Sequence, residues 1–268
     1  MPSPALAAER DSRIALWLDL NTRGLTRDAE SSALSTVRLP NGGELYSGQR
    51  GIWRDKARLS ACPETPEGVT VTVRSTGEHY EDQVEETAII YSYPSTSHAT
   101  TDEGEITATK AAGEFSIPLF VITDSERTPG RRDIHLGWVF AWDDDAGIFE
   151  IRFDTGDGSG PFAQGGATHT RFATLQKYGQ TCAVCGTREA SALAAVPLHL
   201  DAADENEHLV LCAIHRRMLE RKLFRFDPDS TAVVPRAGLK LAEDLGITFP
   251  DLNHLKDRPA REALARLQ

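Results

Sequence analysis

The sequence lacks the long apolar segments of a membrane protein. Its 268 residues contain no apolar run of about 18 residues, the length that a transmembrane helix needs, so we expect no membrane contact. The segment Met1–Arg10 is too polar for a signal peptide. The chain has only four cysteines, and their spacing suits reduced, metal-binding thiols. We therefore expect a cytoplasmic protein.

An excess of positive charge is also missing. The chain carries 29 Lys and Arg against 40 Asp and Glu, a formal net charge of −11. A simple nucleic-acid-binding protein is usually basic, but clustered charge matters more than the sum. Basic residues gather at 50–58, 131–132 and 216–225. The last block is either a phosphate-binding face or a solvated helix face.

The length of the chain suggests two domains, each large enough to bury a core. Residues 45–153 are rich in β-branched and aromatic side chains, which predicts a curved, barrel-like sheet and an α+β fold. The expected helices cover 4–20, 103–112, 236–245 and 258–267, and the first presents Leu6, Ile14, Trp17, Leu18 and Leu20 on one face. The expected parts are a first domain at 1–155, a glycine-rich linker at 156–170 and a second domain at 171–268.

The cysteines carry the strongest local pattern. Cys182-Ala-Val-Cys185 is followed, after 26 residues, by Cys212-Ala-Ile-His215. Zinc prefers four such ligands in a tetrahedron, and a site with four protein ligands is structural because it leaves no position open for substrate. The alternatives are ordinary buried thiols with a surface histidine, or a disulfide. Cys62 lies far upstream, and we interpret it as an ordinary free thiol.

The segments around these ligands carry a family resemblance. They are Tyr178–Gly186, Leu193–Asp201, His208–Arg217 and Leu223–Asp229. Together they resemble a zinc-containing HNH endonuclease domain of the ββα-metal type, over about residues 172–235. The resemblance implies a small ββα domain in which a histidine is the general base and a divalent ion, Mg²⁺ or Mn²⁺, assists cleavage of DNA.

The chain departs from the HNH pattern at three places. These are Val196–Pro197 at the base histidine, Asn206–Glu207 at the asparagine, and Arg216 at the histidine that holds the catalytic metal. An arginine offers no lone pair to a metal. The resemblance leaves His199 as the candidate base, with Asp201 assisting at the metal, and Arg216 and Arg217 as DNA contacts. A weakened nuclease and a zinc-stabilised DNA clamp without chemistry both stay open.

The middle of the chain carries a second resemblance. Gly68–Asp82 and Ala88–Tyr93, preceded by Ser47–Arg54, resemble the core of an SRA domain, a PUA-like β-barrel that reads 5-methylcytosine. The resemblance implies a pocket for a base that has been flipped out of the duplex.

The SRA resemblance assigns roles to particular residues. Tyr80 and Tyr91 would stack on the two faces of the base, and Asp82 would accept a hydrogen bond from the exocyclic amine of cytosine. Tyr93 lies two residues beyond Tyr91 on the same strand face and would also line the pocket. The implied DNA contacts outside the pocket are Arg50, Trp53 and Arg54. The alternative is that these tyrosines are ordinary core or cross-strand residues.

The two resemblances together match the layout of modification-dependent, type IV restriction endonucleases. The implied partner is double-stranded DNA with modified cytosine, and the implied cofactors are structural Zn²⁺ and catalytic Mg²⁺ or Mn²⁺. One alternative is a reader of methylated DNA in which the HNH-like domain is an inactive scaffold. Another is a module that binds RNA or protein. The sequence leaves a homodimer open.

Overall fold

The protein forms two compact units in a computed structural model. The structure describes residues 3–40, 42–45, 51–59, 62–75, 83–161, 166–189, 192–199, 201–245 and 251–267. One unit comprises Met1–Trp142 and Ile148–Gly165, and the other comprises Asp143–Gly147 and Gly166–Gln268. Among the described residues, no helix is both long enough and apolar enough to cross a bilayer.

The first unit is a mixed sheet with helices on its faces. Its helices are α1 (Pro4–Thr22), α2 (Ser31–Leu34), α3 (Lys56–Leu59) and α4 (Ala99–Glu114). Its strands are β1 (Ala29–Glu30), β2 (Ile52–Arg54), β3 (Thr70–Arg74), β4 (Gln83–Val84), β5 (Ala88–Ser92), β6 (Leu119–Asp124), β7 (Arg131–Asp143) and β8 (Ile148–Phe153). The strand order is β2-β3-β6-β7-β8-β5-β4, with β1 paired to β7. The expected mixture of sheet and helices is confirmed, and closure into a barrel stays a prediction.

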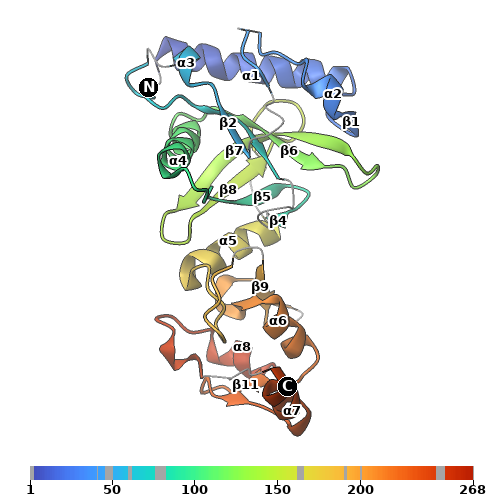
Figure 1. The fold of residues 1–268 in the computed structure, drawn as a ribbon, viewed down its shortest axis with the longest axis vertical. Helices are drawn as coiled ribbons and strands as arrows, with labels where there is room; N and C mark the ends of the chain where they lie inside the picture. Colours follow the sequence, from blue (N-terminus) through green and yellow to red (C-terminus); the bar gives the residue numbers. More distant parts are fainter. Residues whose placement is uncertain are drawn as a thin grey trace. The chain divides into compact units, whose positions relative to one another are not determined.

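Two apolar clusters pack against this sheet. Along β6 they alternate, with Leu119 and Val121 in one and Phe120 and Ile122 in the other, because successive side chains of a strand point to opposite sides. The first includes Val69, Val73, Ile89, Tyr91, Ala111, Ala112, Leu119, Val121, Phe149 and Ile151. The second includes Leu16, Trp17, Leu20, Val71, Phe120, Ile122, Ile134 and Leu136. Helix α4 therefore packs with the first cluster and most of α1 with the second (Figure 1).

Helix α1 buries a charged side chain, Arg13, and exposes one of the apolar side chains that were predicted on its buried face. Leu18 is 41% exposed, so its place on the buried face was wrongly predicted, whereas Arg13 is fully buried. The guanidinium pairs with Glu9 at 2.8 Å and donates to the carbonyl of Pro118 at 2.8 Å. Buried charges are tolerated when they are paired and hydrogen-bonded in this way. Arg13 thus ties α1 to the start of β6.

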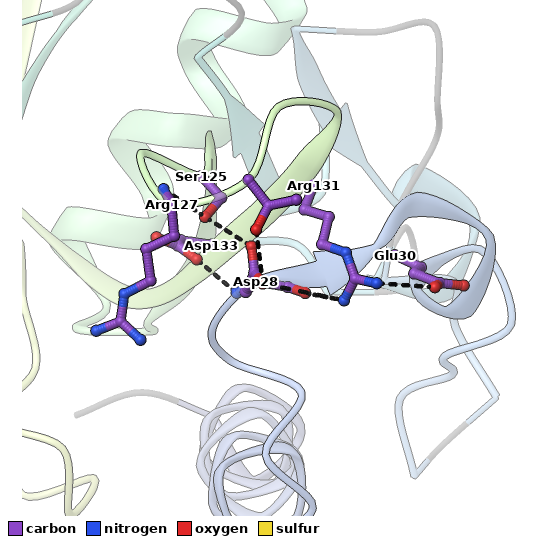
Figure 2. Close-up of polar contacts among 7 residues, drawn as sticks. Asp28, Glu30, Ser125, Arg127, Arg131 and Asp133 are labelled. Atoms are coloured by element: carbon purple, nitrogen blue, oxygen red, sulfur yellow. Dashed lines mark hydrogen bonds and ion pairs between the residues drawn. The ribbon is translucent and has the colours of Figure 1, made fainter.

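The β6–β7 hairpin is fastened to β1 by a polar cluster around Asp28 (Figure 2). The Asp28 carboxylate accepts hydrogen bonds from the hydroxyls of Ser125 and Thr128, each at 3.0 Å. Arg131 donates to the Asp28 carbonyl at 2.9 Å and pairs with Glu30 at 3.1 Å. Because Asp28 has a φ of 53°, its backbone turns sharply at the point where these groups converge.

The second unit is built from short elements. They are α5 (Gly166–Tyr178), β9 (Leu193–Pro197), η2 (Glu205–Glu207), β10 (His208–Cys212), α6 (Ala213–Glu220), β11 (Arg225–Phe226), β12 (Ala232–Val233), α7 (Arg236–Leu245), η3 (Leu252–His254) and α8 (Arg261–Ala265). β9 pairs with β10 and β11 pairs with β12, both antiparallel. The predicted helix at 236–245 is confirmed as α7, and the one at 258–267 is shorter than predicted.

The first part of the predicted linker is an ordered turn. The Asp154 carboxylate accepts hydrogen bonds from the backbone N–H groups of Gly156, Gly158 and Gly160, at 2.8, 2.8 and 2.9 Å. Asp154 is 8% exposed, so this turn is anchored from the side of the sheet. The boundaries 1–155, 156–170 and 171–268 stay a prediction.

Candidate functional site

The first two cysteines of the cluster sit in a tight turn. The N–H of Gly186 donates to the carbonyl of Cys182 at 2.9 Å, and Gly186 has a φ of 70° that favours glycine. The N–H of Ala183 donates to the carbonyl of Val210 at 2.8 Å, which docks the turn on β10. The sulfur atoms of Cys182 and Cys185 are therefore held beside the β9–β10 hairpin.

The other two ligands lie where the hairpin continues into α6. Cys212 ends β10 opposite Leu193, the first residue of β9. Helix α6 begins at the next residue, and His215 lies in its first turn with only 2% of its surface exposed. A Cys-x-x-His spacing across a helix start directs both side chains to one point.

Cys182, Cys185, Cys212 and His215 form a cluster that could hold a metal ion such as zinc. Their ligand atoms all lie within 4.8 Å of one another. The His215 Nδ1 atom is 3.1 Å from the Cys212 sulfur and 3.6 Å from the Cys182 sulfur, and the sulfurs of Cys185 and Cys212 are 3.9 Å apart. With Zn–S bonds of about 2.3 Å, the sulfurs of a tetrahedral site stand about 3.8 Å apart. The donor set and its spacing fit zinc.

The two thiols of the Cys182–Cys185 turn differ in the direction of their pKa shifts. Burial raises the pKa of Cys182 to about 11. For Cys185, burial acts in the same direction, but hydrogen bonds led by those with Thr187 bring its pKa below the ordinary value. Thiolates are the metal-binding form, so a bound cation would offset the cost of ionising Cys182 in this environment.

The opposite end of the β9–β10 hairpin carries His199. Its side chain is 8% exposed, and Nε2 lies 3.3 Å from Oε1 of Glu207. Asp201 is exposed in the turn that follows. Nothing in the pattern of residue types pairs His199 with Glu207, because the two positions are eight residues apart. Among the described residues, no second group of three or more His, Cys, Asp or Glu side chains is placed so that it could hold a metal ion.

The basic clusters of the sequence differ in how far acids neutralise them. On α6, Arg216 and Arg217 both pair with Glu220, at 3.5 and 3.1 Å, and both are about half or more exposed. Arg131 pairs with Glu30 of β1, and Arg132 pairs with Asp124 of β6. The α6 face therefore keeps excess positive charge, since one carboxylate serves two guanidinium groups.

In the first unit, Tyr91 and Tyr93 converge on Phe149. Tyr91 is 7% exposed and lies opposite Phe149 in the β5–β8 pairing. The rings of Tyr93 and Phe149 have centroids 4.4 Å apart, and the Lys110 ammonium lies 5.8 Å from the Tyr93 ring centroid. Both tyrosines pack with the first apolar cluster. Their role in reading a base stays a prediction.

Trp53 and Arg54 on β2 make contacts within the first unit. The Trp53 indole N–H donates to the carbonyl of Glu44 at 3.2 Å. The Arg54 guanidinium pairs with Glu67 and packs against Gly104 of α4 so closely that no Cβ fits there. These contacts hold β2 against α4, and the predicted DNA contacts of both residues stay untested.

Three of the predicted site residues lie outside the described part of the chain. They are Arg50, Tyr80 and Asp82. Gly51 lies close to Tyr91, since a Cβ on Gly51 would stand 3.0 Å from the Tyr91 hydroxyl.

Comparison with known proteins gives distant likenesses. No protein-family model and no curated protein matches the chain. The structure of a modification-dependent TagI restriction endonuclease is similar at 14% identity and a TM-score of 0.34, over 82% of this chain and 85% of that chain. The structure of KRYPTONITE in complex with mCHG DNA and SAH is similar at 16% identity and a TM-score of 0.30, over 40% of this chain and 27% of that chain.

Proposed function

We propose that this protein binds double-stranded DNA carrying 5-methylcytosine or a related modified cytosine, and that its second unit cuts that DNA. The observation that carries the proposal is the order of parts in the second unit. The β9–β10 hairpin is followed directly by helix α6, and the cluster of Cys182, Cys185, Cys212 and His215 lies where β10 ends and α6 begins. This is the order that the HNH resemblance implies, and zinc is its proposed structural ion.

The reading of modified cytosine is proposed for the first unit. Its support is the Tyr80-to-Tyr91 motif in the sequence. The packing of Tyr91 and Tyr93 with the first apolar cluster is what the alternative of ordinary core tyrosines expects. Aromatic faces hold a flipped base by stacking, at roughly 1–3 kcal/mol per base. A base inside a duplex cannot be examined on all its edges, so proteins that must do so flip it out of the helix.

Cleavage is proposed to use His199 as general base on a water molecule. A divalent ion, Mg²⁺ or Mn²⁺, would stabilise the negative charge that develops on the phosphate. Among the described residues, no second group of His, Cys, Asp and Glu side chains comes close enough together to hold that ion. Arg216 and Arg217 would contact the DNA backbone from the exposed face of α6.

The alternative is a reader that binds modified DNA without cutting it. Val196, at the place of the expected base histidine, is 6% exposed within the hairpin core, and Arg216 follows the zinc histidine. In that case the second unit adds affinity through its basic helix face and has no chemistry. A module for RNA would instead prefer single-stranded or A-form ligands.

The test is a gel shift with one duplex in three forms: unmodified, methylated at cytosine C5, and methylated at adenine. A parallel set contains Mn²⁺, and an RNA of the same sequence serves as competitor. Selective binding of the cytosine-methylated duplex with nicking in Mn²⁺ supports the full proposal. Selective binding without nicking favours the inactive reader, and equal binding of all three duplexes would contradict the reading of modified cytosine.

Variants of Tyr80 and Tyr91 test where the base-binding pocket lies. Tyr80→Ala should reduce the preference for methylated duplex by roughly 5- to 150-fold, the equivalent of one lost stack. Tyr91→Phe keeps the buried ring and should preserve the fold, whereas Tyr91→Ala would also remove core packing. If Tyr80→Ala keeps the full preference, the pocket lies elsewhere.

A further inference from the structure

A carboxylate stands next to the candidate base. Nε2 of His199 lies 3.3 Å from Oε1 of Glu207, and both side chains are mostly buried, with 8% and 22% exposed. His199 follows β9 and Glu207 precedes β10, so the end of the hairpin brings them together. The N–H of Leu198 donates to the carbonyl of Glu207 at 2.9 Å, which continues the strand pairing up to this point.

The Glu207 side chain is itself held in place. Its second oxygen, Oε2, accepts a hydrogen bond from the N–H of Ala203 at 2.7 Å. The turn η2 that precedes β10 is capped by the Asp204 carboxylate, which accepts from the N–H of Asn206 at 2.8 Å. The hydrogen bond from Ala203 is the main cause that lowers the pKa of Glu207. Glu207 therefore presents an ionised oxygen, an acceptor only, to the imidazole.

We infer that Glu207 is a positioning residue for His199. As an acceptor, Glu207 keeps the proton of the neutral imidazole on Nε2, which leaves the lone pair on Nδ1. The inference rests on the proposed nuclease function. In the cleavage step, Nδ1 takes a proton from a water molecule, and the water oxygen bonds to phosphorus. The bond from phosphorus to the leaving sugar oxygen breaks, and that oxygen takes a proton from solvent.

A second group competes for the same nitrogen. Nη1 of Arg266, at the end of α8, lies 3.5 Å from Nε2 of His199. A guanidinium donates and cannot accept, so control by Arg266 would put the lone pair on Nε2 and the proton on Nδ1. The shorter approach of Glu207 favours the first arrangement. The position of the imidazole proton is therefore the observable that separates the two.

The first measurement is the ¹⁵N NMR spectrum of the imidazole rings in the full-length protein without added Mg²⁺ or Mn²⁺. The chain has eight histidines, and His199→Gln assigns the signal. We expect the His199 proton on Nε2 in the wild type and a shift toward Nδ1 in Glu207→Gln. Glu205→Gln removes the same charge from the same turn and should leave the spectrum unchanged. A wild-type proton on Nδ1 overturns the inference.

The second measurement is single-turnover nicking of methylated duplex with Mn²⁺. Glu207→Gln should slow nicking at least 10-fold with an unchanged Kd for DNA, Glu207→Asp should restore part of the rate, and Glu205→Gln should match the wild type. Nicking by Glu207→Gln at the wild-type rate contradicts the role. If the wild type does not nick, the proposed nuclease is wrong, and the NMR spectrum still decides whether Glu207 sets the tautomer.

Discussion

The two units of this protein are stabilised in different ways. The first unit has a mixed sheet buried on both faces by apolar side chains from segments far apart in the sequence. The second has short strands and a cluster of three cysteines and a histidine within 34 residues, Cys182–His215. A large sheet distributes its stability over many contacts. The second unit combines its own buried apolar side chains with a cluster that could hold a metal ion, and we expect such an ion to contribute to its folding. The difference leads to predictions for each unit.

The largest effect is expected from Cys182→Ser. Loss of one thiolate should abolish zinc binding, and structural zinc supplies on the order of 10 kcal/mol to small domains of this kind. The second unit should lose its amide protection from hydrogen exchange, while the first unit keeps it. Mass spectrometry measures both the bound metal and the exchange.

Cys62→Ser is the matched control. Cys62 is equally a buried thiol at 7% exposed, but it belongs to the first unit and contacts the Ser3 hydroxyl at 3.2 Å. Its variant should keep the metal and the protection of both units. Retention of metal and protection in Cys182→Ser would mean that the cluster does not hold the second unit together.

The next effect is expected in the first unit, from Arg13→Met. This change removes the ion-pair partner of Glu9 from a fully buried position. Breaking a buried pair on one side costs about 3–5 kcal/mol, which urea denaturation would detect as a lower midpoint. The double variant Glu9→Leu with Arg13→Met should recover part of the loss. If the double variant is no more stable than the single one, the pair is not the cause.

A smaller effect is expected from Gly137→Ala in β7. A Cβ there would stand 2.7 Å from Cγ2 of Ile151 and 2.8 Å from Cγ2 of Val121. Overpacking of this kind costs about 1–3 kcal/mol. Combining Gly137→Ala with Val121→Ala should cost less than the sum of the two single changes, because the second change makes room for the first. If the stability costs of the two single changes simply add in the double variant, the sheet accommodates the new Cβ by moving residues other than Val121.

The smallest effect is a pH dependence of the first unit. Burial, followed by the nearby Arg27, lowers the pKa of His135 to about 4, while Asp133 acts in the opposite direction. The unfolded chain binds the proton more tightly, so the unfolding free energy falls as the pH drops from about 6.5 to about 4. His135→Phe retains a ring to stack on Phe153 and should weaken this dependence. If the unfolding free energy of His135→Phe depends on pH as steeply as that of the wild type, other titrating groups cause the dependence.

The candidate site was only partly predictable from the sequence. The ligands Cys182, Cys185, Cys212 and His215 follow from residue chemistry and short spacing, and the structure brings all four together. The contact of His199 with Glu207 depends on where β9 ends and β10 begins, and no pattern of residue types encodes that register.

The fold shows the same division. Helix α1, the strands around residues 69–153 and helix α7 follow from hydrophobic period and breaker residues. The sequence by itself therefore determined these elements and the two ligand pairs, Cys182 with Cys185 and Cys212 with His215, because each depends on neighbours a few residues apart. Only the tertiary structure decided that Arg13 is buried, that Leu18 is exposed, and that Arg54 packs on α4. The burial of Arg13 and the packing of Arg54 depend on polar groups that distant segments supply to each guanidinium, and the exposure of Leu18 depends on which surface α1 packs against. A pattern of neighbouring residues does not contain this information.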